Sequence, residues 1–138
     1  MKHKSTKYVS NTVIKNVCVL LIFLCFSNGQ ETLQLKQADS LSSKNINNES
    51  VTILKGNIIF KKDSKLLFGD KAIQSNSSGL VQLSENVSIK DDDMTIFCDS
   101  LSYNSDNGNI DLIGNVKIVD LEQSISANTG KIIDNGNK

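Results

Sequence analysis

The chain has 138 residues, with fifteen lysines, no arginine and fifteen acidic side chains, so its formal net charge is zero. A balanced charge gives no reason to expect a nucleic-acid partner, and the lack of arginine excludes bidentate guanidinium forks. The single histidine, His3, lies near the N-terminus, which leaves the rest of the chain without the usual general base and the commonest metal ligand. We therefore expect no enzymatic activity, no cofactor and no metal site.

Residues 1–29 have the pattern of a secretory signal peptide. Four lysines precede the ten-residue apolar run VCVLLIFLCF, which is too short for a membrane-spanning helix of about 20 residues. Ser27 and Gly29 are small residues at the −3 and −1 positions of a cleavage site before Gln30. We expect a cleaved signal peptide over 1–29 and one small exported domain over 30–138; the alternative is an uncleaved membrane anchor.

The expected domain is acidic and has one cysteine. It has 138 − 29 = 109 residues, and its 11 lysines and 15 acidic residues give a net charge of 11 − 15 = −4. Cys98 is the one cysteine left, so no intramolecular disulfide can form.

The domain consists of a repeat of 29 residues. Three ungapped units begin at Val51, Leu80 and Asn109, and a partial unit, QADSLSS, precedes them at Gln37 to Ser43. Self-similarity at a fixed period indicates a repeated supersecondary unit. The chain therefore has about three and a half repeats.

The first half of each unit alternates between apolar and polar residues, which is typical of a strand with one buried face. A pair interrupts each of these strands at its middle: Gly56-Asn57, Glu85-Asn86 and Gly114-Asn115. A glycine inside a strand usually marks a bend or bulge. Because a positive φ at Glu85 would cost about 1 kcal/mol, we expect the bend to depend on the asparagine side chain or on a bulge.

The second half of each unit predicts another bent strand. Its apolar phase slips by one residue at Asp70, Asp99 and Asn128, where a short polar side chain can occupy a bend. Short polar turns separate the strands and imply antiparallel neighbours. The predicted fold is all-β: a creased antiparallel meander of about seven strands.

Three polar or reactive features have a structural explanation. The run Asp91-Asp92-Asp93 could bind calcium, but it lacks EF-hand spacing and fits a solvated turn. Cys98 shares an inward position with Gly69 and Ala127, which favours a small buried side chain over a reactive thiol. The row of Asp70 and Asp99 lacks a neighbouring base or nucleophile, so we expect it to support the bend.

The inward apolar positions are the candidate lipid-binding site. An acyl chain of about a dozen carbons in such a crease could gain on the order of 10 kcal/mol, at about 0.8 kcal/mol per methylene. The alternative is that these side chains fill the interior as an ordinary core. The candidate residues are Leu54, Ile58, Phe60, Leu67, Val81, Leu83, Val87, Ile89, Ile96, Leu101, Tyr103, Ile110, Leu112, Val116, Ile118 and Ile125.

The repeated segments resemble a known family. Each unit contains GNIIF, GNVKI or ENVSI, and the units continue with stretches such as GDKA or CDSLSY and an Asn/Gly turn. This pattern is similar to the organic-solvent-tolerance (OstA-like, LptA) family, which includes periplasmic lipopolysaccharide-transport proteins of Gram-negative bacteria. The resemblance implies a β-taco, or open jelly roll, whose interior receives lipid A acyl chains. It also implies a periplasmic location, and copies that join each other and the β-taco domains of inner- and outer-membrane partners end to end.

Two features bear on that assembly. The expected domain has no proline, and its terminal units have no recognisable polar cap, so its sheet edges are open to strand addition.

Two alternative functions remain. The chain could be an inner-membrane-anchored, LptC-like partner if the leader is not cleaved, or a secreted structural β-repeat protein that binds protein or polysaccharide through its polar face.

Overall fold

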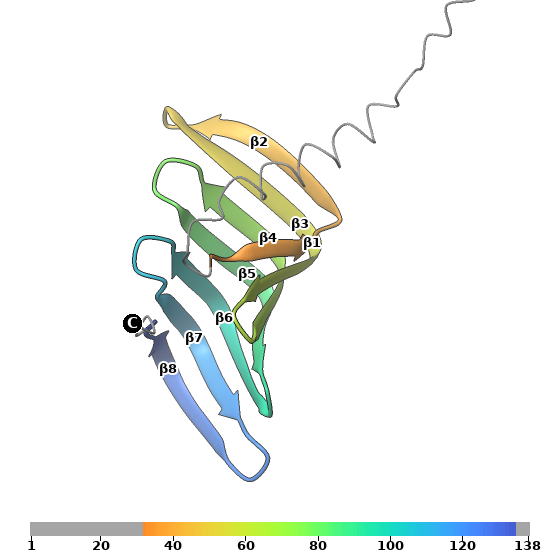
Figure 1. Cartoon of the computed structure of the whole chain (residues 1–138), viewed down its shortest axis with the longest axis vertical. Helices are drawn as coiled ribbons and strands as arrows, with labels where there is room; N and C mark the ends of the chain where they lie inside the picture. The colour runs from red at the N-terminus through yellow and green to blue at the C-terminus, as the bar shows by residue number, and fades with distance from the viewer. Residues whose placement is uncertain (1–31, 135–138) are drawn as a thin grey trace, which may run out of the picture. The chain divides into compact units, whose positions relative to one another are not determined.

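The computed structural model describes residues 32–134, and the strands in this range form one antiparallel sheet (Figure 1). The predicted signal peptide lies outside these residues. The strands are β1 (Gln34–Gln37), β2 (Ser40–Ile46), β3 (Glu49–Lys62), β4 (Lys65–Ser75), β5 (Leu80–Asp91), β6 (Met94–Asn104), β7 (Ile110–Val119) and β8 (Ser124–Ile132). The prediction of an all-β, antiparallel meander is confirmed.

The structure has eight strands where the sequence predicted about seven, because the first strand is broken. β1 pairs with the second half of β3, with Leu35 opposite Phe60, whereas β2 pairs with the first half, with Leu41 opposite Leu54. The break falls at Asp39, where the partial repeat places its bend. From β3 onward the strands follow one another in sequence order and the sheet stays open.

A line of creases crosses the sheet at the predicted positions. The pairing of β3, β5 and β7 with their neighbours changes register where the three repeated pairs lie. Both residues of each pair have a positive φ, between +45° and +75°. The expectation that Glu85 avoids this region is wrong, since its φ is +65°. The bulge supplies the bend, and the glutamate takes the backbone conformation that glycine adopts in the other units.

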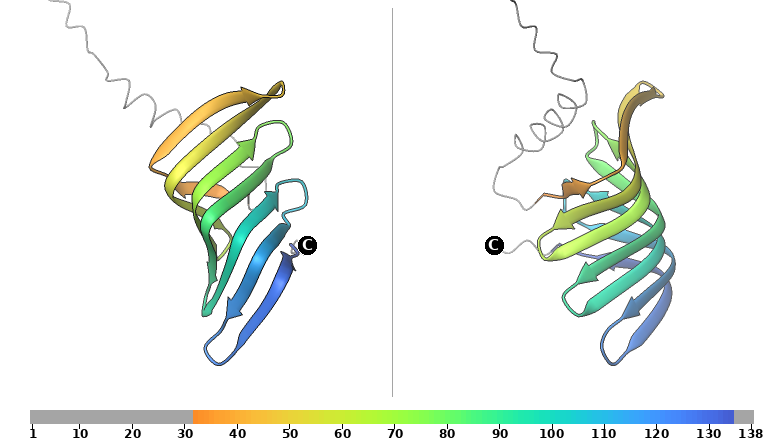
Figure 2. Two further views of the ribbon diagram at one scale, coloured as in Figure 1. Left: turned by 180° about the vertical axis from the view of Figure 1, so that it is seen from behind. Right: turned by 90° about the vertical axis from the view of Figure 1, so that its right-hand side faces the viewer.

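The creases fold the sheet into two facing walls (Figure 2). The first wall consists of β2 and residues 49–55, 71–75, 80–84, 100–104, 110–113 and 129–132. The second wall consists of β1 and residues 58–62, 65–69, 87–91, 94–98, 116–119 and 124–127. The inner faces of both walls meet in one hydrophobic cluster, so the core lies within the crease.

The two ends of the sheet are less covered than its middle. β8 forms one edge, and Ile125 there is 58% exposed. At the other end Leu41 of β2 is 44% exposed, although it continues the same inner row as Leu54. Inward-facing apolar side chains therefore reach the surface at both ends, because no further strand covers them.

The part of the chain that the structure describes contains no helix long and apolar enough to cross a membrane.

Candidate functional site

Apolar side chains form continuous rows along the inner face of each wall. In the first wall, strand register places Leu41, Leu54, Ala72, Leu83, Leu101, Leu112 and Gly130 side by side. In the second wall, it aligns Leu35, Phe60, Leu67, Ile89, Ile96, Ile118 and Ile125. Because side chains alternate between the faces of a strand, each row presents one apolar stripe to the opposite wall.

The structure gathers the predicted lipid-binding residues in this interior. Fourteen of the sixteen are buried: Leu54, Ile58, Phe60, Leu67, Val81, Leu83, Val87, Ile89, Ile96, Leu101, Tyr103, Ile110, Leu112 and Val116. Ile118 is half-buried against the cluster. Ile125 occupies the same inner row but lies on the edge strand, where it is exposed.

The walls are in contact, so the crease is closed in this structure. A Cβ placed on Gly69 of the second wall would lie 2.7 Å from Leu83 Cγ of the first wall. At the next positions of the same inward column, Cys98 is buried and Ala127 lies on the exposed edge strand. At Gly69 the lack of a side chain lets Leu83 of the opposite wall approach closely, as a close-packed interior requires.

Cys98 has the buried structural position that the sequence predicted. Burial raises the pKa of its thiol to about 11, and the nearby Asp99 charge adds to the effect, while a backbone hydrogen bond from Ile113 opposes it. A thiol that stays protonated is a poor nucleophile. The prediction of a small buried side chain is confirmed.

The outer side of each crease carries a hydrogen bond between an asparagine and an aspartate. Asn Nδ2 donates to Asp Oδ2 in three equivalent pairs: Asn57 to Asp39 at 2.9 Å, Asn86 to Asp70 at 2.6 Å and Asn115 to Asp99 at 2.9 Å. The second and third pairs join neighbouring strands where the pairing changes register. The first joins β3 to Asp39, in the break between β1 and β2. This geometry supports the structural role predicted for the aspartates. The sequence reasoning identified the two sets of residues but did not predict that they bond to each other.

Charged side chains line the rim of the second wall, at its turns. The turn predicted over Asp91-Asp92-Asp93 is shorter in the structure: Asp92 and Asp93 form it, and Asp91 is the last residue of β5. Asp91 accepts a hydrogen bond from Ser64 Oγ at 2.6 Å and lies 3.1 Å from Lys65 Nζ. The Ser64 bond, with a smaller contribution from Lys65, lowers the pKa of Asp91 below its usual value.

Lys62 is the residue of this rim that the sequence reasoning missed. It is 4% exposed, and its Nζ lies 2.7 Å from Asp134 Oδ2 and 3.2 Å from Asp63 Oδ2. The alternation in β3 carried a signal, because Lys62 follows Phe60 by two residues and so faces inward.

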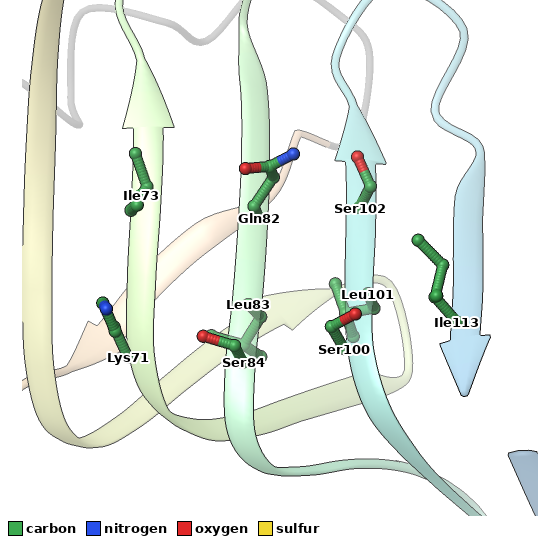
Figure 3. A pocket seen from close by; sticks show the side chains of 9 residues that line it. All are labelled: Lys71, Ile73, Gln82, Leu83, Ser84, Ser100, Leu101, Ser102 and Ile113. Atoms are coloured by element: carbon green, nitrogen blue, oxygen red, sulfur yellow. The ribbon is translucent and has the colours of Figure 1, made fainter. Parts of the chain in front are cut away.

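The outer face of the first wall has a shallow hollow of about 220 Å³ (Figure 3). It is lined by Lys71, Ile73, Gln82, Leu83, Ser84, Ser100, Leu101, Ser102 and Ile113. Leu83 and Leu101 project to the far side of the sheet, and the near side combines polar side chains, such as Gln82 and Ser102, with the apolar Ile73 and Ile113. The hollow is on the opposite face from the apolar crease, and we take the crease as the candidate site because of its continuous apolar rows.

Two of three comparisons with known proteins found similarity. The family model described as OstA-like protein matches residues 30–134. The solved structures similar to this chain include the crystal structure of LptH, the LptA homologous periplasmic component of the conserved lipopolysaccharide transport device from Pseudomonas aeruginosa. That match has a TM-score of 0.57 and 13% sequence identity, and it covers 75% of this chain and 76% of that chain. None of the curated proteins compared with this chain matches it.

Proposed function

The chain belongs to the OstA-like family, and we propose that it is a periplasmic lipopolysaccharide-transport protein that carries lipid A acyl chains between its two walls. The observation that carries this proposal is the pair of continuous apolar rows that face each other across the creases. An apolar interior shared by many strands suits a long hydrocarbon chain better than a small polar ligand.

Lipid entry requires the walls to separate, since their inner faces are in contact in this structure. Opening moves the wall side chains from contact with each other to contact with an acyl chain, an exchange between two apolar surroundings. The net gain then comes mainly from the acyl chain, at about 0.8 kcal/mol for each methylene removed from water. The crease line provides the hinge, because it is where the strand pairing is already interrupted.

The edges suggest how the protein assembles. β8 and β2 are edge strands with exposed inward positions, and the apolar rows continue into both. An edge strand offers unpaired backbone groups to another chain. We propose that copies join at these edges, and that β-taco domains of inner- and outer-membrane partners join in the same way to form a continuous path.

Photocrosslinking in a Gram-negative host tests the function. Photoreactive residues at Leu54, Leu83 and Leu112, on the inner face, should form adducts with lipopolysaccharide. Matched positions on the outer face, Gln82 and Lys117, should not. Gln82 and Leu83 are neighbours in β5, so this pair compares the two faces at the same place in the chain.

The reverse pattern would overturn the proposal. Adducts from Gln82 with a protein or polysaccharide, and no lipid adduct from Leu83, would favour the secreted structural protein, since Gln82 lines the hollow on the outer face. Whether the chain is a released bridge component or an LptC-like anchored partner depends on the leader. N-terminal sequencing of the exported protein should find Gln30 first; an intact leader in the membrane fraction would favour the anchored form.

A further inference from the structure

Lys62 is the one charged residue that is buried in the part of the chain described here, with 4% of its surface exposed. Its neighbour Lys61 is exposed, as are most of the other lysines in this range. A buried ammonium loses its hydration and must be compensated by anions at close range. Asp63 and Asp134 supply that compensation in the closed structure.

The location of Lys62 combines a cation with an apolar row. Ile58, Phe60 and Lys62 follow one another on the inner face of β3, from the crease to the rim. A ligand that fills this row with hydrocarbon would bring the group at its end to the Lys62 ammonium. The matching ligand is an amphiphile with an anionic headgroup.

The two carboxylates that hold Lys62 differ in origin. Asp63 belongs to the same hairpin turn and moves with Lys62. Asp134 follows β8, 72 residues further along the chain, and its backbone N–H donates to Asn109 Oδ1 at 3.1 Å, next to the start of β7 in the first wall. Separation of the walls therefore removes Asp134 from Lys62 but leaves Asp63 in place.

We infer that Lys62 is a headgroup site, which exchanges Asp134 for the phosphate monoester of an amphiphile when the walls open around its hydrocarbon chain. The inference rests on the proposed function, and it specifies the charge of the ligand and the residue that binds the charged group. An ammonium binds phosphate as a point charge with three donors, which requires no guanidinium fork. Asp134 competes with the ligand, so the closed pair keeps the crease shut until an anion replaces it.

Titration calorimetry on the purified full chain tests this with two amphiphiles of one chain length and with phosphate that has no hydrocarbon chain. The probes are dodecyl phosphate, the neutral dodecyl maltoside and inorganic phosphate, with both amphiphiles below their micelle concentrations. Lys62→Met should weaken dodecyl phosphate binding by at least about tenfold, the loss expected for a charge-assisted hydrogen bond. It should change dodecyl maltoside binding by less than about twofold, because the apolar row is intact.

Three further variants complete the test. Lys62→Arg keeps the charge and should keep the preference for phosphate. Lys61→Met removes a charge from the adjacent outward position and should have no effect. Asp134→Asn removes the competitor and should strengthen dodecyl phosphate binding, which keeps the inference testable if Lys62→Met folds poorly.

The outcomes separate the inference from the proposed function. Equal effects of Lys62→Met on both amphiphiles, or none on either, would overturn the headgroup site while leaving lipid binding intact. Binding of inorganic phosphate as tight as that of dodecyl phosphate would also overturn it, since the site would then take free anions. Failure of the unaltered chain to bind either amphiphile would contradict the proposed function itself.

Discussion

Asn86 donates a hydrogen bond to Asp70 across the crease at 2.6 Å, and this pair links two strands where their regular pairing stops. The equivalent bonds of Asn57 and Asn115 repeat the link on the strands before and after. A bulge leaves backbone groups unpaired and lets a strand bend. The side-chain bond ties each bend to the neighbouring strand, and the three bonds follow the same line of creases across the sheet.

Two substitutions of Asn115 separate its hydrogen bond from its backbone conformation. Asn115 has φ +46° and donates to Asp99 at 2.9 Å. Asn115→Gly keeps the conformation accessible and should lower the free energy of unfolding by about 0.5–1 kcal/mol for the lost bond. Asn115→Ala should cost about 1 kcal/mol more, because alanine adopts a positive φ less readily.

Urea unfolding followed by circular dichroism measures both effects on Asn115. Asp99→Ala should match Asn115→Gly, and the double variant should be no worse than either alone. Equal losses for Asn115→Gly and Asn115→Ala would show that the backbone conformation is unimportant here.

Glu85→Gly should stabilise the protein. Glu85 has φ +65° at the position where the other units have Gly56 and Gly114, both at φ +75°. Relief of the left-handed strain should raise the free energy of unfolding by about 1 kcal/mol. The greater entropy of glycine in the unfolded chain offsets part of that gain. Ser84→Gly, one residue earlier within the paired strand, is the control and should destabilise by roughly 0.5–1 kcal/mol. A loss of stability in Glu85→Gly would contradict the claim that the backbone at Glu85 is strained.

The Cys98 thiol should be alkylated slowly in the folded protein, and the rate of alkylation should increase as the pH rises. Burial raises its pKa from 9.0 to about 11. At pH 8 the thiolate fraction is then about a hundredfold smaller than in the unfolded chain, and burial slows alkylation further. Iodoacetamide labelling with and without urea measures the ratio. Similar rates in both conditions would show that the interior is open to solvent.

The same pKa shift makes stability depend on alkaline pH. The folded thiol stays protonated while the unfolded thiol ionises above its ordinary pKa of 9.0, so the unfolded state is favoured as the pH rises past that value. Cys98→Ala should reduce this alkaline loss. An unchanged pH profile in Cys98→Ala would assign the loss to other groups.

Ile125→Lys should weaken association between copies. Ile125 is an inward-row residue on the edge strand β8 and is 58% exposed. A lysine there opposes both apolar contact and strand addition at the edge. Ile133→Lys is the matched control, because Ile133 is 61% exposed but lies beyond the end of β8. Sedimentation velocity should show smaller species for Ile125→Lys alone. An equal effect of both variants would indicate nonspecific hydrophobic association.

The sequence predicted the strands and the crease line because both depend on local patterns. The inward positions of Leu54, Leu83 and Leu112 follow from alternation with period two, and the bend follows from a repeated asparagine. The broken first strand also has a local signal, since Asp39 occupies the same repeat position as Asp70 and Asp99. The half repeat at Gln37 to Ser43, taken alone, does not predict that break.

The spacing between the walls could not be predicted from these patterns. Alternation indicates which face of a strand is buried. Whether Leu83 contacts the opposite wall or a ligand depends on the distance between the walls. The exposure of Ile125 depends on its place at a sheet edge, although its column is apolar in every unit. The ion pair of Lys62 with Asp134 joins residues 72 positions apart, and local spacing carries no information about such a contact.

The most direct test of the account is the distance between the walls with and without lipid. Spin labels at Asp92 and Ser105, on exposed turns of the second and first walls, report that distance in a chain whose cysteines are replaced by alanine. Labels at Ser77 and Ser105, both on turns of the first wall, are the control. Double electron–electron resonance should show that lipopolysaccharide lengthens the distance between the walls and leaves the control distance unchanged. Bound lipopolysaccharide with no change in the distance between the walls would contradict the account.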